Sequence, residues 1–169
     1  SHTAHLTGAD TAYDAVFERY GVIRVFDQEE LLSVAAALAR FPHVPIDKVA
    51  IVSTSGGAGG WAADLCGIAG LDVPVLSEAL QADLSQWIPE FGSTANPVDV
   101  TANAVEAGGV PLVHVLERLQ DSDEVDAFIV NIGLHAPNRI AKLADILGPV
   151  FARARKPILF TSHIVPIAE

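Results

Sequence analysis

Residues 48–69 read KVAIVSTSGGAGGWAADLCGIA, and this stretch predicts a strand, a glycine-rich turn and a helix in succession. The apolar run 49–52 is typical of a buried strand, and the helix is expected from about Trp61 to Ala69. Such a turn directs several backbone N–H groups and the positive end of a helix at one point, which favours a phosphate. Ser53, Thr54 and Ser55 add hydroxyl donors to this candidate anion site.

Helix and strand patterns alternate along the rest of the chain, so the fold class we expect is α/β with a mostly parallel sheet. Asp27, followed by Glu30 three residues later, is a good N-cap for a helix reaching Arg40. Residues 41–45 break the pattern and are interpreted as a linker, and 87–100 are expected to be irregular. The other expected helices are 10–20, one capped by Ser77, 110–119 and 137–154; the other expected strands are 22–25, 71–76, 125–132 and 157–161.

Composition excludes several classes of protein. Ten basic residues against twenty-one acidic ones give a net charge of −11, so nucleic acid is not an expected partner. Half of the residues are hydrophobic, yet no apolar run approaches the ~20 residues of a membrane span. We expect neither a membrane association nor a secretory leader. The single cysteine, Cys66, suits a reducing cytoplasm and lies in a helical apolar pattern that indicates core packing.

The glycine-rich turn is compatible with more than one ligand. A Walker loop requires Gly-Lys-Ser/Thr, and the turn contains no lysine. Gly57, Gly59 and Ala62 fit the dinucleotide pattern G-x-G-x-x-A, but the acidic residue expected after the second strand has only Glu78 as a candidate. Glycines that merely permit a tight turn between strand and helix are a further alternative.

A histidine near the start of the chain provides the second signal. His2 lies in a small, polar, glycine-containing segment, SHTAHLTG, directly before an amphipathic helix. This segment resembles the phosphohistidine segment of the NDP-forming acyl-CoA synthetases, which are relatives of succinyl-CoA synthetase. Four further segments resemble that family in order and spacing: 53–64 (STSGGAGGWAAD), Gly70-Leu71, 96–101 (NPVDVT) and 125–130 (VDAFIV).

The resemblance implies a phosphoryl relay and assigns residues to it. Phosphate converts acyl-CoA to an acyl phosphate, the acyl phosphate phosphorylates a histidine, and the phosphohistidine phosphorylates ADP. His2 would be the catalytic nucleophile. The phosphate cradle would comprise Ser55, Gly56, Gly57, Ala58 and Gly59, and Asn96 and Asp99 would orient this loop. The alternative for Asn96 and Asp99 is an Asn-Pro turn in which the Asp99 carboxylate makes local hydrogen bonds.

The resemblance also implies the architecture and the missing parts. Residues 1–45 would be the phosphohistidine segment with connecting helices, a short helix-strand-helix unit, and 46–169 a flavodoxin-like CoA-ligase domain. Both ends look cut, so we expect a fragment of a longer chain. The full enzyme would use CoA, ADP or ATP, and Mg²⁺, with CoA-binding and ATP-grasp domains as partners and a small-molecule acid or acyl-CoA as substrate. We expect the fragment alone to be inactive and to bind no cofactor, and a homo-oligomer is compatible with its apolar surface.

Two departures from the family pattern concern the proposed site. Ala4-His5 stands where the family usually has Gly-Ala, so His5 could compete for the phosphate, and Trp61 follows the glycines where relatives carry small residues. The other histidines, His43, His114, His135 and His163, show no metal-ligand spacing, and no metal site is assigned. Two other functions stay open: a regulatory, ligand-sensing module of an acyltransferase fusion, and a free-standing nucleotide- or flavin-binding domain.

Overall fold

The computed structural model describes residues 10–41, 44–134 and 137–164. Contacts divide the chain into two compact units, Ser1–Pro42 and His43–Glu169, and each is described by itself. His2, His5, His43 and His135 lie outside the described residues. The functional roles assigned to residues 1–45 and 46–169 stay predictions.

The first unit contains two helices, α1 (Asp10–Tyr20) and α2 (Gln28–Arg40). The predicted N-cap of α2 is confirmed, because the Asp27 side chain accepts a hydrogen bond from the Glu30 N–H at 2.8 Å. The strand predicted at 22–25 is wrong. These residues run as an irregular connection without a partner strand among residues 10–41, and Arg24 instead forms ion pairs with Asp10 and Asp14 of α1 at 2.9 and 2.5 Å.

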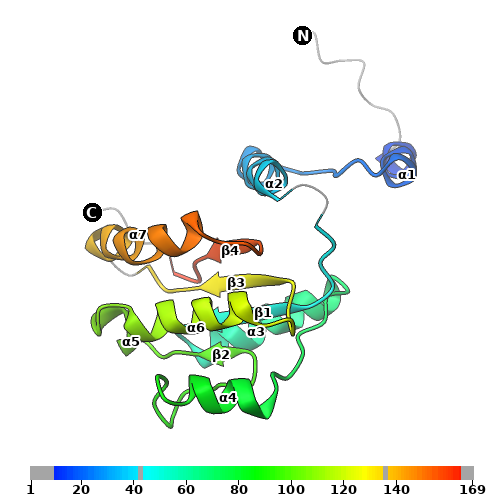
Figure 1. Ribbon diagram of the computed structural model, residues 1–169. Coiled ribbons are helices and arrows are strands. Elements are labelled where there is room, and N and C mark those ends of the chain that lie inside the picture. The colour runs from blue at the N-terminus through cyan, green and yellow to red at the C-terminus, as the bar shows by residue number, and fades with distance from the viewer. Residues whose placement is uncertain (1–9, 42–43, 135–136, 165–169) are drawn as a thin grey trace. The chain divides into compact units, whose positions relative to one another are not determined.

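The second unit is built on a four-stranded sheet in which every strand pair is parallel, which confirms the predicted α/β class (Figure 1). The strand order is β2-β1-β3-β4, the order of the first four strands of a flavodoxin-like sheet. Register pairs Ser53 with Asp99 on one side and with Asn131 on the other, so the carboxyl ends of three strands meet. The strands are β1 (Val49–Ser53), β2 (Val98–Asp99), β3 (Ala127–Asn131) and β4 (Ile158–Thr161).

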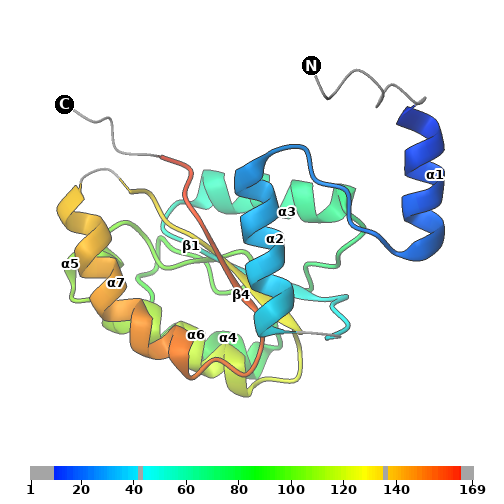
Figure 2. The same cartoon turned by 90° about the horizontal axis from the view of Figure 1, so that it is seen from above.

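Helices cover the two faces of the sheet unequally. Figure 2 shows α3 (Gly56–Ile68) on the side opposite α4, α6 and α7. Cys66 of α3 packs against Val49 and Ile51, which confirms its predicted place in the core, and burial raises the pKa of its thiol. The larger core lies on the other face, under α4 (Glu78–Leu84), α5 (Asn103–Glu106), α6 (Val110–Asp121) and α7 (Pro137–Ala152).

The strand predicted at 71–76 is wrong, and a side chain explains why. Only Asp72 bridges to the sheet, at Lys48, and its carbonyl accepts the Val49 N–H at 2.9 Å. Beyond that point the edge of β1 is taken by the Asn96 amide, which bonds the Ile51 N–H and the Val49 carbonyl at 2.9 and 3.0 Å. The backbone of residues 73–76 therefore has no free N–H or carbonyl groups at this edge of β1 with which to pair.

Other element boundaries differ from prediction by small amounts. The helix expected from Trp61 begins at Gly56, because Ser55 caps it and the glycines form its first turn. The region 87–100, expected to be irregular, contains the short strand β2. Helix α7 ends at Ala152 rather than 154, and α6 continues to Asp121 rather than 119. No helix in the described parts of the chain has both the length and the apolar character needed to cross a bilayer.

Candidate functional site

A pocket of about 340 Å³ lies at the N-terminus of α3, where the sequence predicts an anion site. One wall is the glycine-rich turn and the first turn of the helix. The other is the segment that leads into β2. The lining residues are Ser53, Ser55, Gly56, Gly59 and Gly60 on the first wall, and Phe91, Gly92, Ser93, Pro97, Val98 and Asp99 on the second.

Two backbone N–H groups of this helix end are free to bind a ligand. The Ala58 N–H donates to Ser55 Oγ at 3.4 Å, and the Gly59 N–H donates to the Ser55 carbonyl at 2.9 Å. The N–H groups of Gly56 and Gly57 donate no hydrogen bond within the described residues, and both glycines are exposed. Together with the helix dipole, these donors suit the anion site that the sequence predicts here, which stays a prediction.

The glycines of the turn do not share one role. A Cβ at Gly59 would lie 3.1 Å from Pro97 Cβ and 3.4 Å from Ser53 Cβ, so Gly59 lets α3 pack closely on the sheet. Gly57 and Gly60 have open space where a Cβ would point. Ala58 is half-buried, and its N–H serves the cap. Of the predicted cradle, only Gly56 and Gly57 therefore offer backbone N–H groups that donate no hydrogen bond within the described residues.

The serines before the helix brace the turn. Ser53 Oγ donates to the Ser55 carbonyl at 2.9 Å and accepts the Ser55 N–H at 3.1 Å. Ser55 Oγ accepts the N–H of Ala58 and so keeps its own proton for another acceptor. The Thr54 N–H donates to the Asn131 carbonyl at 3.3 Å, which fixes the turn to β3. Ser55 is thus the serine whose hydroxyl can serve a ligand in the pocket.

Asn96 acts on the sheet rather than on the turn. Its side chain is 8% exposed, and its Nδ2 donates to the Pro74 carbonyl at 2.9 Å in addition to its two bonds with β1. The Asn96–Pro97 peptide bond is cis, and Asn96 itself has φ +86°. The amide therefore ties together β1, the 73–76 segment and the approach to β2.

Asp99 stands beside the free helix end. Its Oδ1 accepts the Thr101 N–H at 2.9 Å, which is the local hydrogen bond considered as an alternative for this residue. Its Oδ2 has no partner in the described structure and lies 3.1 Å from the point where a Gly56 Cβ would stand. The side chain is half-buried and lines the pocket. A negative charge therefore flanks the predicted phosphate site.

The sequence alone did not single out two residues that line this pocket, Phe91 and Gly92, or Thr101, whose N–H donates to Asp99. Phe91 is 75% exposed at the rim of the pocket. Gly92 is required by packing, since a Cβ there would lie 2.5 Å from the Asp99 carbonyl oxygen. Thr101 has φ +67°, rare for a β-branched residue, and its buried Oγ1 has no partner. No periodicity marks such residues, because each depends on a tertiary contact.

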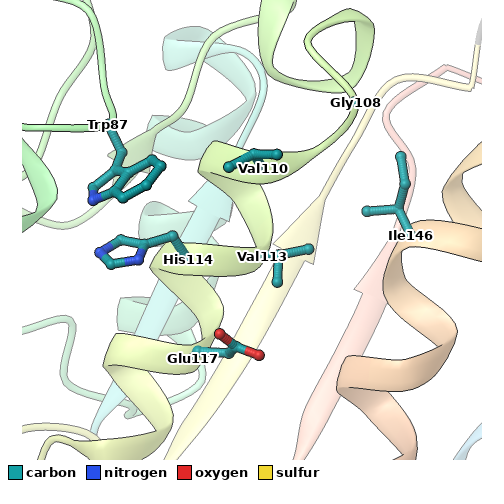
Figure 3. Close-up of a pocket in the computed structure, with 7 residues that line it drawn as sticks. All are labelled: Trp87, Gly108, Val110, Val113, His114, Glu117 and Ile146. Atoms are coloured by element: carbon teal, nitrogen blue, oxygen red, sulfur yellow. The ribbon is translucent and has the colours of Figure 1, made fainter.

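The described histidines lie elsewhere. His114 stacks on Trp87, with ring centroids 4.3 Å apart, in a separate pocket of about 380 Å³ along α6 (Figure 3). Nearby, a 2.6 Å hydrogen bond from Arg118 to Asp83 lowers the pKa of the Asp83 carboxyl. His163 Nδ1 lies 2.6 Å from Asn131 Oδ1. Across the described ranges, no group of three or more His, Cys, Asp or Glu side chains is arranged to hold a metal ion.

Two family models match the chain. The succinyl-CoA ligase-like flavodoxin domain matches residues 1–38, and the Ligase-CoA domain matches residues 49–112, which include the whole glycine-rich turn, Asn96 and Asp99. Both matches and the curated relatives below support a resemblance of the chain to the NDP-forming acyl-CoA synthetase family. The predicted resemblance is thereby confirmed.

Curated relatives of this chain are ADP-forming ligases. It is 29% identical over 159 residues to the 4-hydroxybutyrate–CoA ligase of Nitrosopumilus maritimus, covering 94% of this chain and 22% of that one. It is 38% identical over 104 residues to the alpha subunit of acetate–CoA ligase I of Pyrococcus furiosus, covering 62% of this chain and 22% of that subunit. The chain therefore spans about a fifth of the length of these relatives.

Solved structures of a synthetase share the fold. The dinucleotide-forming acetyl-coenzyme A synthetase 1 of Ca. Korarchaeum cryptofilum, solved in complex with phosphate and ADP, superposes with a TM-score of 0.74. The match has 22% sequence identity and covers 95% of this chain and 34% of that one. The likeness supports the flavodoxin-like architecture predicted for the second unit.

Proposed function

We propose that this chain is the phosphoryl-handling part of an NDP-forming acyl-CoA synthetase, which interconverts acyl-CoA, ADP and phosphate with an acid, CoA and ATP. The observation that carries the proposal is the end of α3, where Gly56 lines a pocket and the N–H groups of Gly56 and its neighbour Gly57 are free. This helix end lies inside the segment matched by the Ligase-CoA model. The phosphate in the complex of the Korarchaeum relative is in keeping with this use.

In the proposed relay His2 is the nucleophile. Phosphate attacks the acyl-CoA carbonyl, a C–O bond forms, the C–S bond breaks and CoA leaves as the thiolate. A ring nitrogen of His2 then attacks the phosphorus of the acyl phosphate, and the acid leaves as its carboxylate. Finally a β-phosphate oxygen of ADP attacks phosphohistidine, which gives ATP and restores the imidazole.

The end of α3 contributes binding and charge stabilisation to this relay. We assign binding of the equatorial oxygens of the transferring phosphoryl group to the N–H groups of Gly56 and Gly57 and to the Ser55 hydroxyl. Hydrogen bonds and a helix dipole hold these oxygens without a covalent bond, so the transfer stays reversible. Gly59 and Ser53 act indirectly, since they fix the position of the helix end against β1. Asn96 holds the edge of β1 itself.

The remaining substrates belong to other parts of the enzyme. We assign CoA to a CoA-binding domain and nucleotide with Mg²⁺ to an ATP-grasp domain, either in the same polypeptide or in partner subunits. The described residues of this chain contain no group of three or more acidic, His or Cys side chains arranged to hold a metal ion. The buried, unpaired Cys66 thiol fits the proposed cytoplasmic location.

The test uses the polypeptide or complex that contains this chain, supplied with acetyl-CoA, ADP, phosphate and Mg²⁺. We expect ATP and free CoA to form in equal amounts, His2→Ala to abolish ATP formation, and His5→Ala to retain most of it. ATP formation that survives His2→Ala would overturn the assignment of the relay to His2. Other acyl-CoA esters, aliphatic and aromatic, then define the acyl group.

A further inference from the structure

The Asp99 carboxylate lies beside the place where the proposed function puts a phosphate. Asp99 Oδ2 is close enough to Gly56 that a Cβ on that glycine would stand 3.1 Å from it. Asp99 and the end of α3 line the same pocket. An oxyanion bound to the N–H groups of Gly56 and Gly57 would therefore have a negatively charged neighbour.

The Asp99 carboxylate is held at this place. Its Oδ1 is engaged by the Thr101 N–H at 2.9 Å, and β2 anchors its backbone, since the Asp99 N–H donates to the Ser93 carbonyl at 2.9 Å. Its Oδ2 has no hydrogen-bond partner in residues 44–134 or 137–164. Among the residues that the structure describes, no lysine or arginine lines the pocket to compensate the charge. Oδ2 is thus a fixed, unused hydrogen-bond acceptor.

A fixed hydrogen-bond acceptor beside an anion site distinguishes oxyanions that carry a proton from oxyanions that carry none. Phosphate and arsenate retain a proton near neutral pH, so one of their oxygens can donate an O–H to a carboxylate. Sulfate is fully ionised and offers only acceptors, so the same carboxylate repels it and gains no hydrogen bond. An acceptor that selects a protonated ligand costs affinity for every ligand that lacks the proton.

We propose that Asp99 is a specificity-determining residue that makes the pocket select oxyanions bearing a proton, phosphate above all, and reject sulfate. In the bound state the P–OH group donates to Asp99 Oδ2, while the ionised oxygens accept from Gly56, Gly57 and the Ser55 hydroxyl. No bond to phosphorus changes on binding. The inference rests on the proposed phosphate site but not on His2 or on any other part of the enzyme.

The test measures anion affinities of the 169-residue chain labelled with ¹⁵N. Phosphate, arsenate and sulfate are titrated at neutral pH and constant ionic strength, and the shifts of the Gly56 and Gly57 amide signals report binding. We expect wild type to bind phosphate and arsenate at least about tenfold more tightly than sulfate. In Asp99→Asn, sulfate affinity should rise about tenfold and the preference for phosphate should disappear.

Asp64→Asn is the matched control. Asp64 is an exposed residue of α3 outside the pocket, and its substitution makes the same change of net charge. We expect it to leave the ratio of phosphate to sulfate affinity within about twofold of wild type. An equal gain of sulfate binding in Asp64→Asn would assign the effect to net charge and overturn the proposal.

The wild-type chain alone can also refute the inference, even if Asp99→Asn fails to fold. Sulfate binding within about twofold of phosphate binding would overturn the role of Asp99 and leave the phosphate site itself standing. No shift of the Gly56 and Gly57 signals with any anion would instead remove both the phosphate site and the inference.

Discussion

Gly59 shows at the scale of one residue why a glycine-rich turn is needed here. A methyl group at Gly59 would press against Pro97 and Ser53, whereas one at Gly60 would enter open space. We expect Gly59→Ala to lower the free energy of unfolding by about 1–3 kcal/mol through overpacking. Gly60→Ala, the control, should raise it by roughly 0.5–1 kcal/mol because alanine is the better helix former. Chemical denaturation checks both, and equal effects would refute the packing role of Gly59.

Asn96 carries the next prediction at this scale. Replacement by alanine removes three hydrogen bonds and leaves the Ile51 N–H and the Val49 carbonyl buried without partners. We expect Asn96→Ala to destabilise the chain by about 2–3 kcal/mol in urea unfolding. Asn103→Ala, an exposed asparagine, should cost less than about 0.5 kcal/mol. A loss below 1 kcal/mol for Asn96→Ala would show that the amide does not hold the edge of β1.

At the scale of the element, a carboxylate fixes the start of β1. Asp126 Oδ2 accepts the backbone N–H groups of Lys48 and Asp47 at 2.8 and 3.0 Å, and these bonds lower the pKa of its carboxyl. The lowered pKa means that the folded state favours the ionised form. The resulting stability is therefore fully present above the unfolded pKa of about 3.9 and is lost as the pH falls through the folded value.

Asp126→Asn tests this account of β1. At pH 7 we expect the variant to be less stable by about 1 kcal/mol, since a charge-assisted acceptor becomes a neutral one. The difference from wild type should shrink as the pH falls below about 3.9 toward the lowered folded pKa of the wild-type carboxyl, because protonation of that carboxyl removes its charge. Asp123→Asn, an exposed neighbour, should show no such pH dependence. A constant difference from pH 7 to pH 3 would contradict the role of the ionised carboxylate.

The same scale explains what the sequence could predict of the fold. Strands β1, β3 and β4 and helices α1, α2, α6 and α7 follow from local periodicity, because burial on one or both faces leaves a regular pattern. The segment 71–76 has an equally apolar pattern, yet a side chain twenty residues later, Asn96, takes its place on β1. Such competition for backbone groups leaves no local signal.

The candidate site was predictable in part for a related reason. Glycines after a buried strand predict a helix end with free N–H groups, and the structure has such an end at Gly56 and Gly57. Anion binding at residues 55–59 stays a prediction. Which residue of this site serves packing and which could bind a ligand was not predictable from the sequence. That Gly59 serves packing, and that the Asp99 carboxylate flanks Gly56, depends on distances between β1, β2 and α3.

At the scale of the whole molecule, the two units differ in how they bury apolar surface. Neither α1 nor α2 has a buried residue, and both core clusters lie in the second unit. Helices of 11 and 13 residues are marginal in water without tertiary packing. We expect a peptide of residues 10–41 to show little helix by circular dichroism.

The complementary fragment supplies the control. Residues 43–169 should unfold cooperatively, within about 1 kcal/mol of the whole chain, because they contain every cluster of the core. A peptide of residues 10–41 that is fully helical alone, or a 43–169 fragment that unfolds without cooperativity, would contradict this division of stability.

The most direct test of the proposed function is acid-labile phosphate on the polypeptide or complex that contains this chain, after incubation with Mg²⁺ and γ-³²P-labelled ATP. The account predicts label in wild type and in His5→Ala that is released by mild acid and removed by added ADP, and no label in His2→Ala. Equal labelling of His2→Ala, or no label in wild type, would contradict the phosphohistidine relay and favour a regulatory module.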